Sequence, residues 1–124
     1  MNEKFNTIMP ETTDRVLCIM VDKPVSTEGY KENFLPRIEK MIADHGEIRC
    51  LVYFKHYQGW EEEAAALDFT MTAKLGNKLK RFAVVNPPQK LLALHNLRKP
   101  LITGETRAFN ETELKEALLW VQGN

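Results

Sequence analysis

The chain has 124 residues, 44% of them hydrophobic, and its 17 basic residues balance 17 acidic ones. This length predicts a single domain, 1–124, whose core needs no metal or disulfide staple, and the composition excludes long disordered or low-complexity segments. The hydrophobic runs are too short to cross a membrane and no signal-like segment opens the chain, so we expect cytoplasmic residence.

Hydrophobic periodicity predicts strands that alternate with helices along most of the chain. The short turn before residue 15 favours a hairpin between the first two strands, whereas later strands, joined by helices, should pair in parallel through right-handed crossovers. The pattern predicts an α/β domain in which residues 1–14 form an N-terminal strand and turn. The expected elements, in chain order, are strands at 5–9 and 15–22, a helix at 27–44, a strand at 48–54, a helix at 61–75, a strand at 82–85, a helix at 89–97, a strand at 105–109 and a C-terminal helix.

Three local signals mark helix boundaries. Pro36 lies inside the helix expected at 27–44, where it must kink the helix or begin a second one because proline has no backbone donor. Asn86, followed by two prolines, is expected to cap the next helix. Asn110 and Glu113 have the spacing of a capping box before the last helix.

Residue types that carry catalysis or cofactor binding are scarce or scattered. No two of the six glycines lie close enough for a dinucleotide or Walker loop, and Ser26, the only serine, stands where an N-cap is expected. Cys18 and Cys50 lie in apolar strands, where a thiol behaves as a small buried hydrophobe, and the histidines lack metal-ligand spacing. The three carboxylates of 61–63 should stabilise the helix they begin and repel phosphate. We therefore predict no catalytic residue, metal site or cofactor, and no enzyme.

Positive charge gathers in one part of the chain, since residues 74–107 contain eight basic residues and one acidic residue. The helix expected at 89–97 lies in this segment, and its leucines spread over more than one stripe. Lys90, Arg98 and Lys99 flank these leucines, a composition typical of a helix at an anionic lipid surface. The alternative is a core-packed helix with solvated basic ends. Nucleic acid is not expected, because the aromatic platforms on which bases stack are missing.

The loop at 55–60 follows the carboxyl end of a strand expected at the centre of the sheet. In open α/β sheets, ligands bind outside such ends, near a reversal of strand order. Tyr57 and Trp60 offer amphipathic ring surface there, and His56 can change charge near neutral pH. The alternative is that these aromatic side chains hold the loop against the following helix.

Short motifs in a fixed order carry a family resemblance over nearly the whole chain, from about Arg15 to Val121. They are Tyr30…Leu35-Pro36, Ile42-Ala-Asp-His-Gly46, Phe54…Gly59-Trp60, Asp68-Phe69, Phe82-Ala-Val-Val85, Gly104-Glu105-x-Arg107-x-Phe109 and Glu116-Ala117-Leu118-x-Trp120-Val121. On these motifs the chain resembles the SpoIIAA-like proteins, a branch of the STAS superfamily (sulfate transporter and anti-sigma factor antagonist domains). The resemblance implies a single domain with a mixed sheet of about five strands and four helices.

The chain departs from true anti-sigma factor antagonists at one position that decides their function. Those proteins carry a phosphorylatable serine where the strand after the first helix leads into the second helix, and residues 54–66 here contain no serine or threonine. Partner switching by phosphorylation is therefore not carried over. An alternative remains: a STAS-type regulatory module that binds a partner protein near Gly59 and Trp60. The SpoIIAA-like branch is also similar in fold to CRAL-TRIO lipid-binding domains, which hold apolar ligands under a movable helix.

These observations predict a non-enzymatic domain that binds a small apolar or amphipathic, lipid-like ligand. The pocket is expected between the sheet and the helices at 61–75 and 89–97, the second acting as a movable lid, and the protein would associate peripherally with membrane. A regulatory protein and a second copy of the chain are further candidate partners. The expected ligand-binding residues are Tyr57, Trp60, Phe69, Met71, Leu91, Leu92 and Leu94. The expected membrane-contacting residues are Lys90, Arg98 and Lys99.

Overall fold

Five strands form one mixed sheet in the order β1-β2-β3-β4-β5, with β1 antiparallel to β2 and the other neighbours parallel. The computed structural model describes residues 7–55, 59 and 61–123, apart from the side chains of Lys90, Leu94 and Arg98. The strands are β1 Thr7–Ile8, β2 Val16–Val21, β3 Ile48–Phe54, β4 Leu79–Val85 and β5 Glu105–Phe109. The helices are α1 Thr27–Gly29, α2 Leu35–His45, α3 Glu62–Leu75, α4 Gln89–Arg98 and α5 Leu114–Val121.

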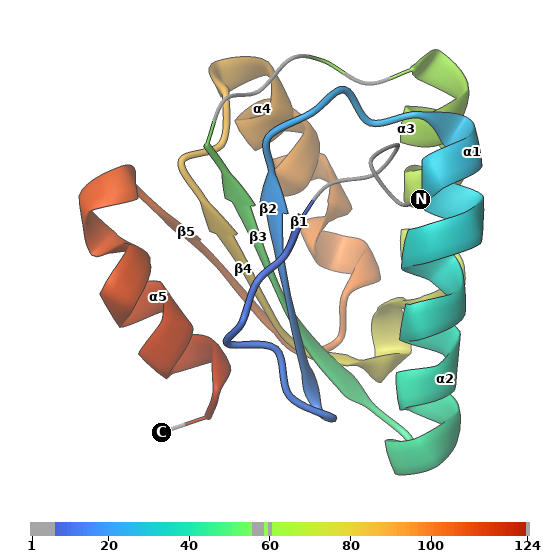
Figure 1. The fold of residues 1–124 in the computed structure, drawn as a ribbon, viewed down its shortest axis with the longest axis horizontal. Coiled ribbons are helices and arrows are strands. Elements are labelled where there is room, and N and C mark those ends of the chain that lie inside the picture. The colour runs from blue at the N-terminus through green and yellow to red at the C-terminus, as the bar shows by residue number, and fades with distance from the viewer. Residues whose placement is uncertain (1–6, 56–58, 60, 124) are drawn as a thin grey trace.

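The helices form two layers, one on each face of the sheet (Figure 1). Parallel strands added in one direction through right-handed crossovers place successive helices on the same face, and α1 to α4 share one face. The helix α5 follows the last strand and covers the opposite face. The α/β class and the five-stranded mixed sheet expected from the sequence are confirmed.

The order of the described strands does not reverse anywhere in the sheet. A ligand site near the carboxyl end of β3 was expected from the rule that ligands bind where strand order reverses. This argument for the loop at 55–60 is wrong, because no such reversal adjoins β3. Residues 56–58 and 60 themselves lie outside the described part of the chain.

Successive side chains of β3 belong to different cores because side chains alternate between the two faces of a strand. Cys50 and Val52 face α2 and α3, whereas Leu51 and Tyr53 pack in the core that α5 covers. Strand β3 is therefore buried on both faces, as its nearly continuous hydrophobic run predicts.

A π-helical segment resolves the conflict that Pro36 creates in the helix expected at 27–44. The chain forms the short helix α1, then the π-helix Tyr30–Phe34, and then α2. The N–H of Leu35 donates to the carbonyl of Tyr30, five residues back. Because an α-helical bond reaches only four residues back, the helix is wider immediately before the proline. Pro36 then lies in the first turn of α2, where a missing N–H costs no helical hydrogen bond.

Two of the three helix caps expected from the sequence are present in the structure. The hydroxyl of Ser26 accepts from the N–H of Gly29 at 3.0 Å, and Asn110 and Glu113 form the expected capping box. The prediction for Asn86 is wrong, because the residue before α4 is Pro88. Asn86 has a left-handed backbone (φ 56°), and its Nδ2 donates to the carbonyl of Phe54 at 2.8 Å.

Two arginines hold the C-terminal end of α5 against the sheet. Arg49 Nη1 donates to the carbonyl of Val121 at 3.2 Å, and Arg81 Nη1 donates to the carbonyl of Trp120 at 2.5 Å. The last carbonyls of a helix have no partner within the helix, so these bonds satisfy groups that would otherwise need water. The Arg81 guanidinium also lies 5.0 Å from the centre of the Trp120 ring.

A tyrosine on β3 makes stability depend on pH in the alkaline range. Tyr53 Oη donates to Glu111 Oε2 at 2.6 Å, and this bond, with burial and the negative charge of Glu111, raises the pKa of Tyr53. The unfolded chain ionises first, near pH 10, so this stabilisation is complete below that pH and is lost as pH rises through the folded pKa. We expect the unfolding free energy of the wild type to fall more steeply than that of Tyr53→Phe above about pH 10, measured by urea denaturation. Parallel curves for the two proteins would contradict the assignment.

Candidate functional site: an apolar cavity on the helical face of the sheet

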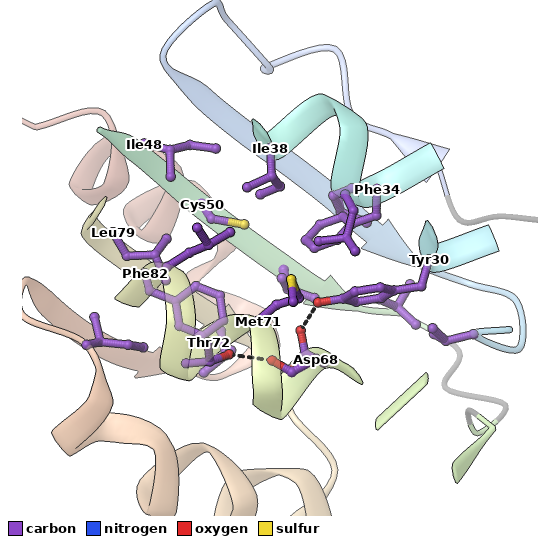
Figure 2. A pocket seen from close by; sticks show the side chains of 18 of the residues that line it. Tyr30, Phe34, Ile38, Ile48, Cys50, Asp68, Met71, Thr72, Leu79 and Phe82 are labelled. Carbon is purple, nitrogen blue, oxygen red and sulfur yellow. Dashed lines mark hydrogen bonds between the residues drawn. The ribbon is translucent and has the colours of Figure 1, made fainter. Parts of the chain in front are cut away.

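A cavity of about 120 Å³ lies between the sheet and the layer formed by the π-helix, α2 and α3 (Figure 2). Its floor consists of apolar side chains from β2, β3 and β4 that point toward the helices, among them Ile19, Cys50, Val52 and Phe82. The walls are equally apolar except at one end, where α3 meets the π-helix. The space is suited to an apolar group, because apolar walls offer a water molecule no hydrogen-bond partners.

The cavity exists because α3 presents a poorly filling face to the sheet. Asp68, Met71, Thr72 and Leu75 line the cavity, and their spacing of three and four residues places them on one side of the helix. Two of these four side chains are short and polar. Near the start of the helix the fully buried side chain is that of Ala64, which has only one carbon to contribute.

The polar end of the cavity is built from two elements that lie far apart in the sequence. Tyr30 Oη, on the π-helix, donates to Asp68 Oδ1 at 2.5 Å, and Thr72 Oγ1 donates to the carbonyl of Asp68 at 2.8 Å (Figure 2). Tyr30 is only 4% exposed, and its ring lies 5.0 Å from that of Phe34. A π-helical turn, a feature often found at functional sites, thus carries the side chain that closes one end of the cavity.

Of the ligand-binding residues expected from the sequence, the cavity lining includes Met71. Phe69 is its near neighbour on α3 but lies on another side of the helix and is 40% exposed. Leu91 and Leu92, on α4, are not part of the lining. Tyr57 and Trp60, and the side chain of Leu94, lie outside the described residues.

The cavity lies in a different place from the expected pocket. One wall is α3, as predicted, but the other is formed by the π-helix and α2 instead of α4. Helix α4 is anchored to the sheet by His95, which is 1% exposed and lies with its ring 5.7 Å from that of Phe82 on β4. Leu91, on the same helix, is also buried. These contacts favour the core-packed alternative for the inner side of α4.

The sequence reasoning missed Tyr30, Phe34 and Asp68 as site residues. In the sequence, Tyr30 and Asp68 stand out only within family motifs, and Phe34 lies in the helix expected at 27–44. A signal was nevertheless present, because Asp68 shares a helical face with Met71 and Leu75, where an acidic residue needs a partner from another element.

The model of the SpoIIAA-like family matches residues 16–122. The chain belongs to the SpoIIAA-like family. A solved structure of an uncharacterised protein of the DUF3478 family with a SpoIIAA-like fold, from Shewanella loihica PV-4, is 21% identical to the chain. The similarity covers 94% of this chain and 91% of that one, with a TM-score of 0.70, and it concerns the fold alone. No protein of curated function matches the chain.

In this SpoIIAA-like domain, an acidic residue at the start of α3 joins two helices. The Oε1 of Glu61 accepts from the N–H of Thr27 at 2.9 Å, at the start of α1, and this bond lowers the pKa of Glu61. The backbone of Val25 also pairs with Gly59 and Glu61. The carboxylate therefore stabilises α1 as well as the helix that it precedes.

In the described part of the molecule, no three His, Cys, Asp or Glu side chains gather where a metal ion could bind. Burial, with a smaller effect from the carboxylate of Glu11, raises the pKa of Cys18 to about 12, which makes its thiol a poor nucleophile near neutral pH. No helix in the described ranges has the length and hydropathy to span a membrane.

The bond between Tyr30 and Asp68 should stabilise the fold as well as close the cavity. We expect Tyr30→Phe to lower the unfolding free energy by about 1–3 kcal/mol, because the bond joins a buried donor to a carboxylate. A double-mutant cycle with Asp68→Ala, measured by urea denaturation, should give a coupling energy of at least about 0.5 kcal/mol. The same cycle with Asp44→Ala, on the exposed side of α2, should be additive, and additivity in both cycles would show that the bond contributes nothing.

Proposed function

We propose that this domain is a non-enzymatic binding protein whose ligand is a small apolar or amphipathic molecule held between the sheet, the π-helix, α2 and α3. The proposal is carried by the cavity, in which apolar walls leave polar groups at one end only. An apolar cavity of about 150 Å³ accommodates benzene, so a volume of about 120 Å³ suits a slimmer apolar group such as a short alkyl chain.

Filling the cavity should abolish binding. We expect 1-hexanol, titrated into the labelled protein, to shift the methyl resonances of Ile19 and Ile38 and to leave those of Val121, on the opposite face, unchanged. The substitution Val52→Phe places a ring in the cavity and should eliminate these shifts, whereas Leu119→Phe, at an exposed site on α5, should not. Resonance shifts spread over both faces of the wild-type protein, or no shifts at all, would contradict the proposal whether or not Val52→Phe folds. Either result would make the STAS-type protein-interaction role the leading hypothesis.

The outer side of α4 supports the finer proposal of peripheral membrane association. Leu97 is 68% exposed and Lys99 is exposed beside it, while the inner side of the same helix is anchored to the sheet. The sequence adds Lys90 and Arg98, whose side chains lie outside the described set. Each cation near an anionic bilayer contributes about 1 kcal/mol, so together with an exposed leucine they would give weak, salt-sensitive binding.

Membrane binding is tested by co-sedimentation with vesicles rich in phosphatidylserine. We expect binding at low salt that falls at high salt, and that falls about tenfold or more on charge reversal of Lys90, Arg98 and Lys99. Leu97→Ala should also weaken binding, whereas Leu119→Ala, which removes a 55% exposed leucine on the other face of the sheet, should not. Equal binding by all four proteins would remove membrane association from the proposal and leave the cavity unaffected.

A further inference from the structure

We infer that a polar cleft at the amino ends of the parallel strands binds a small, doubly charged oxyanion such as a phosphate group. The cleft has a volume of about 460 Å³ and lies where β2, β3 and β4 begin, at the lower edge of the sheet in Figure 1. Its lining includes the cationic side chains of Arg15, Arg49 and Lys80 and one carboxylate, that of Glu47. Among the described lining residues, Ile48 alone also borders the apolar cavity, so this second site goes beyond the proposed function.

The topology of the sheet brings the three cations together. Arg15 immediately precedes β2, and Arg49 and Lys80 are the second residues of β3 and β4. These three strands are parallel neighbours, so their amino ends meet at one edge of the sheet. The N–H of Arg49 donates to the carbonyl of Arg15 at 3.1 Å, which fixes the first two residues relative to each other.

A bulge in β4 explains why Lys80 lines the same cleft as Arg49. Ile48 pairs with Leu79 and Arg49 with Arg81, so Lys80 is an extra residue with no partner on β3. Bulges redirect the side chain that they carry and are common beside functional sites. The bulge packs tightly against Gly104, where a Cβ would collide with the carbonyls of Leu79 and Lys80.

The two arginines have charge to offer a ligand. Among the residues that the structure describes, no carboxylate forms an ion pair with Arg15 or Arg49, and the carboxylate of Asp14 lies 3.4 Å from His45 instead. Arg49 uses Nη1 to bond to the carbonyl of Val121 at 3.2 Å. A guanidinium has five N–H donors, so this bond orients the group and leaves donors for an anion.

The one carboxylate in the lining reduces the positive charge without cancelling it. Glu47 Oε2 lies 3.6 Å from Lys80 Nζ, and both side chains are about half exposed, so this ion pair is weak. An ammonium group has three donors and can contact a ligand as well as Glu47. The described lining therefore keeps a net charge of +2. Guanidinium groups match the geometry of phosphate and carboxylate oxygens, and a double negative charge balances this lining best.

The inference is tested by titrating inorganic phosphate into ¹⁵N-labelled protein at constant ionic strength, with sodium chloride as the balancing salt. We expect saturable shifts of the backbone amide resonances of Arg49 and Lys80, while that of Ala64, at the start of α3, stays unchanged. Acetate, which carries a single charge, should bind at least about tenfold more weakly. Arg15→Gln should weaken phosphate binding about tenfold without loss of stability, because its exposed side chain makes no described ion pair.

The matched control is Arg37→Gln, which removes the same charge from the exposed side of α2 and should leave phosphate binding unaltered. Shifts that do not saturate, equal affinities for phosphate and acetate, or equal losses in the two arginine variants would each overturn the inference. If Arg15→Gln does not fold, saturation and the comparison with acetate in the wild type decide. None of these results bears on the apolar cavity, whose methyl resonances at Ile19 and Ile38 report on it separately.

Discussion

The arrangement of the whole domain depends on β3, which is buried on both faces and pairs in parallel with β2 and β4. Because its side chains alternate between faces, one strand supplies both cores: Cys50 and Val52 form part of the cavity floor, and Leu51 and Tyr53 pack beneath α5. The helices pack differently against the two faces of the sheet. On the α5 face, two arginines bond to the C-terminal end of the helix and Tyr53 bonds to Glu111 in the turn before it. On the other face, α2 and α3 leave an apolar space.

That difference explains why the candidate site lies where it does. Sheet and helix pack closely where large apolar side chains interdigitate, and α3 brings Asp68 and Thr72 to this face where leucines would fill it. The π-helix before Pro36 supplies Tyr30, which satisfies the Asp68 carboxylate from the opposite wall. One proline and one aspartate, more than thirty residues apart, thereby define the polar end of a cavity that is otherwise apolar. The exposed side of α4, which carries Leu97, is a separate surface.

Much of the fold could be predicted from the sequence because its signals are local. The run at 48–54 is typical of a strand buried on both faces, the spacing of Asn110 and Glu113 predicts a capping box, and the four later strands are separated by helices that require parallel pairing. The start of β4 was placed too late because Lys80 and Arg81 interrupt the hydrophobic pattern, although the side chain of Arg81 reaches α5. The two prolines after Asn86 predict that it caps the next helix, but in the structure its side chain bonds to the carbonyl of Phe54 at the end of β3.

The sequence by itself determined the family, the order of the elements and the alternation that buries β3, since each depends on residues close together in the chain. It also identified Met71 among the residues that line the cavity. Only the tertiary structure decided which helices enclose the cavity, because that depends on how α2 and α3 pack across three strands. The pairing of Tyr30 with Asp68 was likewise beyond sequence reasoning: a hydrogen bond between residues 30 and 68 leaves no periodic trace, and it forms only when both helices lie on the same face of the sheet.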